Sequence, residues 1–159
     1  MMNRDNAVFT EMKRIGHEWE EQRAAHQAKK QGIIDAFGWD SVELKAWYDE
    51  KEANKFPFTS GQSKAYRAWA ESLSRRQDEM EMSDFLFDTE VHDFIETLRR
   101  AGIDTFVYTN TSTAVMENIH AFNAEGYRLD ELCSVTRHED RWGTEEPYTV
   151  QGIRFTRVW

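Results

Sequence analysis

The sequence contains few of the residues that mark specialised classes of protein. One cysteine, two prolines and eight glycines occur in 159 residues. A single cysteine excludes an internal disulfide and a metal site built from several thiolates, and so little proline and glycine argues against a disordered or collagen-like chain. No run of about 18 apolar residues is present, which argues against a transmembrane helix. The first residues form no apolar signal segment either, so we expect a cytoplasmic protein that does not bind membranes.

Positive charge is also scarce. The 20 Lys and Arg residues are outnumbered by 29 Asp and Glu residues, which gives a formal net charge of −9. Residues 83–159 hold 14 acidic and 7 basic residues, a net charge of −7, which leaves −2 for residues 1–82. Because a domain that binds nucleic acid directly usually carries net positive charge, we expect a protein partner and no direct contact with nucleic acid.

Apolar residues at helical spacing dominate the first half of the chain. They make up 40% of the whole sequence, and the aromatic residues 13%, which suffices for a core that should include most aromatic rings, Trp39 among them. Gly32 is predicted to end the first helix, and Asp40, with Glu43 three residues on, to cap the second. Thr59-Ser60-Gly61-Gln62 offers a capping box for the third. We expect helices at residues 6–31, 40–54 and 59–83.

The second half alternates between helix and strand signals. Apolar residues at i, i+3, i+4 and i+7 from Val91 to Leu98 predict a helix, which Gly102 and Ile103 end in a Schellman motif. A change in side-chain alternation at Gly152 predicts a β-bulge. β-branched and aromatic residues predict strands at 103–109, 132–137 and 148–159, and apolar spacing predicts a further helix at 113–125.

Together these elements predict an α+β fold. An N-terminal three-helix segment, residues 1–82, should pack on a small mixed sheet formed by an α-β-α-β-β module, residues 83–159, in one compact unit. The first strand, the following helix and the second strand are expected to form a right-handed parallel unit. The last two strands are expected to form an antiparallel hairpin.

The densest charge in the sequence is an acidic run between residues 78 and 96. It places eight carboxylates in nineteen residues without a Lys or Arg: Asp78, Glu79, Glu81, Asp84, Asp88, Glu90, Asp93 and Glu96. Such a face resembles a phosphate backbone in charge spacing and would attract the nucleic-acid channel of a basic partner. Alternatively, the acids only solvate the surface and favour the start of a helix. Trp142, in a polar loop beside Gly143, is a candidate anchor for the same partner.

A second candidate site joins the strand predicted at 103–109 to the helix that follows. Its residues are Thr109, Asn110, Thr111, Ser112 and Thr113. Backbone N–H groups at a helix start, with hydroxyls around them, can bind an anion such as phosphate. Alternatively, one of these side chains only caps the helix. The segment has no glycine, so it is neither a P-loop nor a dinucleotide-binding loop.

Support for metal or acid–base chemistry is weak. His138-Glu139-Asp140 is one compact donor set, and Asp88 with His92 four residues on is another. Such sets arise by chance in a chain with 29 acids, so the sequence predicts no metal, no cofactor and no catalytic residue. Cys133 is expected to face the interior of the sheet as a small apolar residue.

The segment Phe94–Ile103, together with Thr105–Tyr108 and Thr111–Thr113, resembles a module of small accessory proteins. Those proteins are encoded by phages and conjugative elements of Gram-positive gut bacteria. The resemblance covers the last half of the chain and rests on its pattern of residues. It implies an accessory gene of a mobile element and brings no catalytic residues with it.

Two functions follow as hypotheses. The first is a non-catalytic protein-interaction factor of a mobile element, an acidic inhibitor of a host nucleic-acid-binding or defence system in the manner of an anti-CRISPR protein. The alternative is a small phosphate- or metal-binding enzyme that uses residues 109–113, with His138-Glu139-Asp140 as donors. The sequence leaves the identity of the partner and the oligomeric state open.

Overall fold

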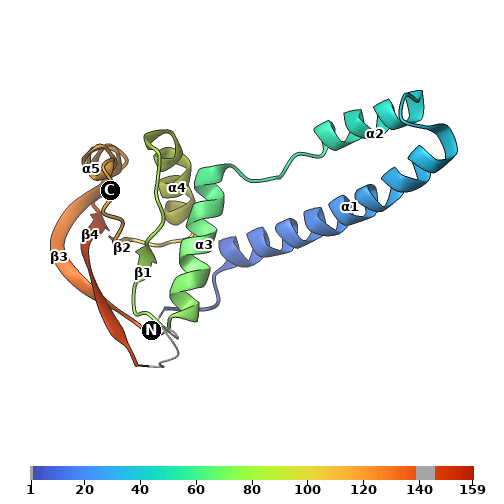
Figure 1. The fold of residues 1–159 in the computed structure, drawn as a ribbon. Coiled ribbons are helices and arrows are strands. Elements are labelled where there is room, and N and C mark those ends of the chain that lie inside the picture. The colour runs from blue at the N-terminus through green and yellow to red at the C-terminus, as the bar shows by residue number, and fades with distance from the viewer. Residues whose placement is uncertain (1, 139–145) are drawn as a thin grey trace. The chain divides into compact units, whose positions relative to one another are not determined.

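The computed structural model describes residues 2–138 and 146–159, apart from the side chains of residues 52 and 53. Within these residues it confirms an α+β fold of five helices and a four-stranded mixed sheet (Figure 1). The chain divides into two compact units. We call Thr10–Phe58 the helical unit, and Met1–Phe9 together with Thr59–Trp159 the sheet unit.

The helical unit consists of α1 (Ala7–Phe37), whose first turn belongs to the sheet unit, and α2 (Val42–Ala53). The predicted stop at Gly32 is wrong, because the helix continues through it to Phe37 and is followed by Gly38, which has a φ of 85°. The predicted cap at Asp40 is also wrong, since Ser41 Oγ accepts the Leu44 N–H at 3.0 Å.

The two helices of this unit are joined along their length by indole hydrogen bonds. Trp47 Nε1 on α2 donates to the His26 carbonyl on α1 at 2.7 Å, and the two rings stack with centroids 4.4 Å apart. Trp19 Nε1 donates to the Asn54 carbonyl at 3.2 Å. These two hydrogen bonds and the ring stacking fix how α2 lies along α1.

The sheet unit begins with α3 (Ser60–Ser74), whose predicted capping box between Thr59 and Gln62 is confirmed. The helix ends at Ser74 and does not reach residue 83, because Arg76 adopts a φ of 53° and turns the chain away. The following β1 (Met80–Met82) is a strand that the sequence did not predict.

The helix α4 (Asp88–Arg100) forms as predicted, and its C-terminus shows the expected Schellman bond. Ile103 N–H donates to the Leu98 carbonyl at 2.9 Å, and Gly102 has a φ of 70°. The remaining elements are β2 (Thr105–Tyr108), α5 (Val115–Ala124), β3 (Tyr127–Arg137) and β4 (Tyr148–Arg157).

The strand order is β1-β2-β4-β3. The parallel unit is therefore β1-α4-β2, and the predicted pairing of β2 with β3 is wrong because β4 inserts between them. The antiparallel hairpin of β3 and β4 is confirmed, and Figure 1 shows it as the long curved pair of strands. The bulge lies between Leu129 and Glu131 instead of at Gly152. Gly152 serves another purpose, since a Cβ there would lie 2.6 Å from Val107 Cγ1.

The core of the sheet unit is a cluster of aromatic rings between the sheet and the helices α4 and α5. Phe106 on β2, Phe155 on β4 and Phe122 on α5 are fully buried. The Phe122 ring lies 5.2 Å from Phe106 and 4.9 Å from Phe155, both in edge-to-face geometry. Phe94 on α4 completes the cluster, 5.5 Å from Phe106.

The division of the chain falls at Thr59, not at the predicted boundary near residue 82, because α3 packs into the sheet unit. Ser72 Oγ on α3 accepts the Glu81 N–H of β1 at 2.8 Å, which satisfies a backbone group at the sheet edge.

Among the described residues, no helix has both the length and the apolar character that crossing a membrane requires.

Candidate functional site

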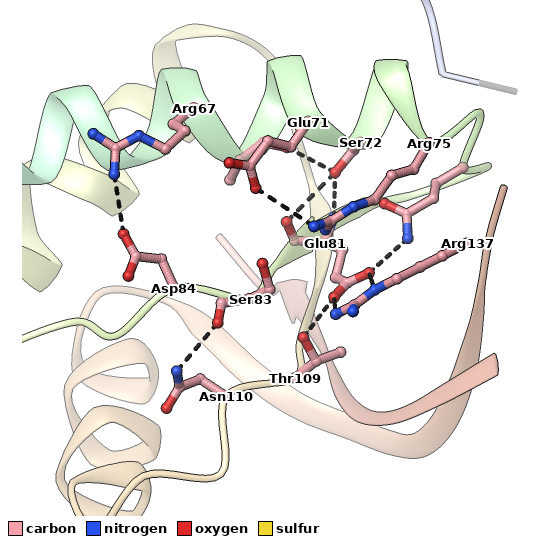
Figure 2. A network of polar contacts seen from close by, with 12 residues as sticks. Arg67, Glu71, Ser72, Arg75, Glu81, Ser83, Asp84, Thr109, Asn110 and Arg137 are labelled. Atoms are coloured by element: carbon pink, nitrogen blue, oxygen red, sulfur yellow. Dashed lines mark hydrogen bonds and ion pairs between the residues drawn. The ribbon is translucent and has the colours of Figure 1, made fainter. Parts of the chain in front are cut away.

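Glu81, at the centre of the acidic run, is buried inside the sheet unit. It lies on β1, is 1% exposed, and pairs with Arg137 from β3 (Figure 2). Arg137 Nε donates to Glu81 Oε1 at 3.0 Å, while Thr109 Oγ1 donates to Oε2 at 2.6 Å. Gln77 Nε2 donates to Oε1 at 2.6 Å. The prediction that Glu81 contacts a partner is therefore wrong, because its carboxylate is used within the fold.

The charge state of this buried pair follows from two opposing effects. Burial alone would raise the pKa of Glu81, since it removes the carboxylate from water. The hydrogen bonds from Arg137, Thr109 and Gln77 outweigh burial and hold the pKa of Glu81 below its usual value. The bond to Glu81 also raises the pKa of Arg137. The ionised pair links β1 and β3, the two edge strands of the sheet.

Three further carboxylates of the acidic run are paired with cations that come from other elements of the same unit. Hydrogen bonds from Lys64 and Ser60 outweigh the burial of Glu90 and lower its pKa. Much of the run therefore neutralises the chain's own cations. The pairs are Glu79–Arg154 at 2.9 Å, Asp84–Arg67 at 3.4 Å and Glu90–Lys64 at 2.7 Å.

The other acids of the run lie nearer to solvent. Asp78 and Asp88 are exposed and Asp93 is half-buried. Asp88, in the first turn of α4, accepts the Thr89 N–H at 2.9 Å, while Glu96 pairs with Arg99 at 2.6 Å. A continuous face of eight carboxylates is thus reduced to scattered surface acids.

The loop Thr109–Thr113 lies beside the segment that follows β1, at the carboxyl ends of the parallel strands. Thr109 donates to Glu81, and Asn110 Nδ2 donates to the Ser83 carbonyl at 3.1 Å (Figure 2). Asn110 Oδ1 accepts the Ser112 N–H at 3.0 Å. Thr111 and Thr113 are exposed. Thr109 and Asn110 therefore hold the loop against β1 and the segment that follows it, and the residue before α5 is Ala114, which makes no side-chain cap.

The predicted donor sets do not form a metal site in the described part of the chain. His92 pairs with Glu125, the residue that follows α5, where Nδ1 and Oε1 are 2.9 Å apart, and not with Asp88. Backbone N–H of His138 donates to the Arg75 carbonyl at 3.1 Å. Glu139, Asp140 and Trp142 lie outside the described residues. Among residues 2–138 and 146–159, no group of three His, Cys, Asp or Glu is placed to hold a metal ion.

Cys133 lies on β3 and is half-buried. Burial raises the pKa of its thiol, and the nearby charge of Glu79 raises that pKa further. A raised pKa keeps the sulfur protonated at neutral pH, which makes it a poor nucleophile.

The turn between α1 and α2 carries a surface that the sequence did not predict. We call residues 35–43 the tip segment. Trp39, expected in the core, is 70% exposed, and its neighbours Phe37 and Val42 are 58% and 81% exposed. The segment also holds three exposed carboxylates and no Lys or Arg. The carboxylates are those of Asp35, Asp40 and Glu43.

Sequence comparison places the sheet unit in a family. The family described as a domain of unknown function, DUF7698, matches residues 64–157, more than half of the chain, and the chain belongs to this family. No curated protein and no solved structure matches the chain. The match lies wholly within the sheet unit and leaves the helical unit outside it.

Proposed function

We propose that this protein is a non-catalytic protein-interaction factor whose tip segment docks into a basic partner. The single observation that carries the proposal is the exposure of Phe37, Trp39 and Val42 at 58%, 70% and 81% within nine residues. Large apolar side chains clustered at the surface and rimmed by polar groups are typical of sites for protein partners.

The kind of partner follows from the chemistry of the tip segment. Trp39 resembles the aromatic anchors that dominate binding energy at interfaces, so the partner needs an apolar pocket that can take an indole ring. Asp35, Asp40 and Glu43 surround this anchor without a neighbouring cation in the segment. Complementary charge then requires Lys or Arg around the pocket of the partner.

The finer form of the proposal names the class of partner. A basic nucleic-acid-binding protein of the host has the required charge, and the chain would inhibit it in the manner of an anti-CRISPR protein encoded by a mobile element. The net charge of −9 supports this form, because it favours encounter with a basic surface. In the acidic run, the surface acids Asp78, Asp88 and Asp93 would assist such an encounter.

The enzymatic alternative receives less support from the geometry. In the loop at residues 109–113, the Thr109 hydroxyl is hydrogen-bonded to Glu81. The Asn110 side chain is hydrogen-bonded to the backbone of Ser83 and of Ser112. An anion site would instead offer these groups to a ligand. We therefore retain the interaction factor as the proposed function.

The proposal is tested by capture of partners from a lysate of the native host. Trp39→Ser combined with Val42→Ser should lose the main captured protein, and Asp40→Lys combined with Glu43→Lys should weaken its capture. Surface changes of this kind alter stability by only about 0.5 kcal/mol, so the fold should persist.

Leu132→Ser is the matched control, because Leu132 on β3 is 79% exposed and lies outside the tip segment. This variant should capture the same protein as the wild type. If the tip variants capture as well as the wild type while Asp78→Lys with Asp88→Lys does not, the acidic run is the binding surface. If no variant changes the capture, docking through the tip segment is refuted.

A further inference from the structure

The helical unit contains a cleft of about 160 Å³ between α1 and the end of α2. Its lining combines two aromatic rings, three cationic side chains, one imidazole and three amides, and it includes no carboxylate among the described residues. The two rings are those of Trp19 and Phe56. The cations are Arg23, Lys51 and Lys55.

The three cations of the cleft are not neutralised within the described part of the chain. None of them forms an ion pair there, and Arg23 and Lys51 instead lie beside aromatic rings. The Arg23 guanidinium lies 5.5 Å from the centroid of Trp19, and Lys51 Nζ lies 5.7 Å from that of Trp47. Three cations without an ion-pair partner around one cleft attract an anionic group, and this local attraction acts against the net negative charge of the whole chain.

The imidazole of His26 lies at the inner wall of the cleft. Its side chain is 11% exposed and stacks on Trp47, and its Nε2 lies 3.3 Å from Glu50 Oε2. The side chain of Glu50 is 64% exposed, and its carboxylate lies next to the imidazole. The anionic group must therefore be bound by the three cations, and not by His26.

The aromatic wall of the cleft is held in place. The Trp19 and Phe56 rings meet edge to face with centroids 4.9 Å apart, and the Trp19 indole is fixed by its hydrogen bond to the Asn54 carbonyl. Phe56 is 46% exposed, so part of its ring is open to a ligand. Aromatic rings beside cations are the combination that binds nucleobases together with their phosphates.

We propose that this cleft binds a nucleoside phosphate, with the base against Trp19 and Phe56 and the phosphate held by Arg23, Lys51 and Lys55. Cavities for drug-sized ligands are roughly 300–1,000 Å³, so this smaller cleft takes one planar ring and leaves the rest of the ligand outside. The ligand is a free nucleotide or one unit of a single-stranded nucleic acid. The summed charge of −2 for residues 1–82 hides this local excess of cations. The site lies apart from the tip segment and does not depend on the proposed function.

Calorimetric titration of the full chain tests the site with four probes: AMP, adenosine, inorganic phosphate and a short oligodeoxyadenylate. AMP should bind more tightly than adenosine or phosphate, because only AMP offers both ring and charge. Equal affinity for AMP and the oligonucleotide would identify a free nucleotide as the ligand. Tighter, salt-dependent binding of the oligonucleotide would identify single-stranded nucleic acid. If AMP and the oligonucleotide do not bind, or adenosine or phosphate binds as well as they do, the proposal is refuted.

Matched variants locate the binding. Arg23→Gln and Lys55→Gln should each weaken AMP binding about tenfold or more, since each removes a charge-assisted contact to phosphate. Lys13→Gln and Lys45→Gln remove the same charge from the same unit, outside the cleft, and should leave the affinity unchanged. An equal loss in both pairs would indicate bulk charge and overturn the site. Trp39→Ser with Val42→Ser should still bind AMP, which separates this test from that of the proposed function.

Discussion

The two units of the molecule differ in the pairing of their charged side chains and in the burial of their aromatic side chains. In the sheet unit, Glu81 pairs with Arg137 inside the fold, and the aromatic cluster around Phe106 is fully buried. In the helical unit, Lys55 has no ion-pair partner among the described residues, and Trp39 is 70% exposed. A side chain that is paired or buried within the chain contributes to stability, while an exposed side chain without an internal partner can contact a ligand. The comparison places a buried ion pair and an aromatic core in the sheet unit, and it leaves the helical unit as the place of both proposed binding sites.

The largest expected effect comes from breaking the buried pair of the sheet unit. Glu81→Gln leaves the Arg137 charge without its counterion, and loss of one partner of a buried pair costs about 3–5 kcal/mol. Denaturant unfolding at pH 7 should show this fall in the free energy of unfolding. Glu11→Gln in α1 is the control, since its pair with Arg14 is on the surface. A surface pair contributes about 0–1 kcal/mol, and equal losses in both variants would contradict the comparison.

At acidic pH, the difference in the free energy of unfolding between the wild type and Glu81→Gln should disappear. The pKa of Glu81 is lower in the folded than in the unfolded state, where an ordinary glutamate has a pKa of about 4.3. The stability that this group contributes is complete above about pH 4.3 and is lost as the pH falls through the folded pKa. The stabilities of the two proteins should therefore approach each other as the pH falls below about 4.3 and become equal only below the folded pKa of Glu81.

Replacing a glycine by alanine should lower stability in the sheet unit and raise it in the helical unit. A Cβ at Gly61 on α3 would lie 2.4 Å from the Glu90 carbonyl oxygen of α4, so Gly61→Ala must separate two helices and should cost about 1–3 kcal/mol. A Cβ at Gly16 in α1 meets nothing within 4 Å. Gly16→Ala should raise helix stability by about 0.5–1 kcal/mol. Thermal unfolding followed by circular dichroism measures both, and equal signs would refute the contrast.

The smallest expected effect concerns an exposed pair between α4 and α5. The hydrogen bond to Glu125 raises the pKa of His92, so the stability this pair adds is complete below the ordinary histidine value of about 6.5. It is lost as the pH rises through the folded pKa. His92→Gln should therefore destabilise the protein slightly at pH 6 and leave it unchanged at pH 9. NMR titration of His92 reads the pKa directly, and Glu125→Gln should return it toward the ordinary value.

The parts of the fold that the sequence predicts are those decided by neighbouring residues. The capping box at Thr59 and the helix stop at Gly102 depend on side chains three or four positions apart, and both are confirmed. Gly32 failed as a stop because a glycine tolerates a helical backbone as readily as a left-handed one. Only the path of the chain after Gly38 decides where a positive φ is needed.

The parts that the sequence does not predict depend on residues far apart. Met80–Met82 has the apolar pattern of a helix extension, and only pairing with β2 makes it a strand. Glu81 reads as a surface acid because its cation, Arg137, comes 56 residues later. Trp39 reads as a core residue, since aromatic character alone does not show that the turn around it has nothing to pack against. The candidate binding sites were hard to predict for the same reason. Which acids are exposed enough to contact a partner depends on burial, and burial depends on residues far apart in the sequence.

The chain enters and leaves the helical unit from the sheet unit, between Phe9 and Thr59. The two crossing points are fixed to one helix, since the Phe9 ring stacks on Trp69 of α3 at 4.9 Å and Thr59 caps that helix. A segment inserted at such a place can be exchanged, shortened or duplicated during evolution without altering the order of the strands. If the helical unit carries the proposed binding sites, their specificity would be able to change during evolution while the sheet scaffold stays the same.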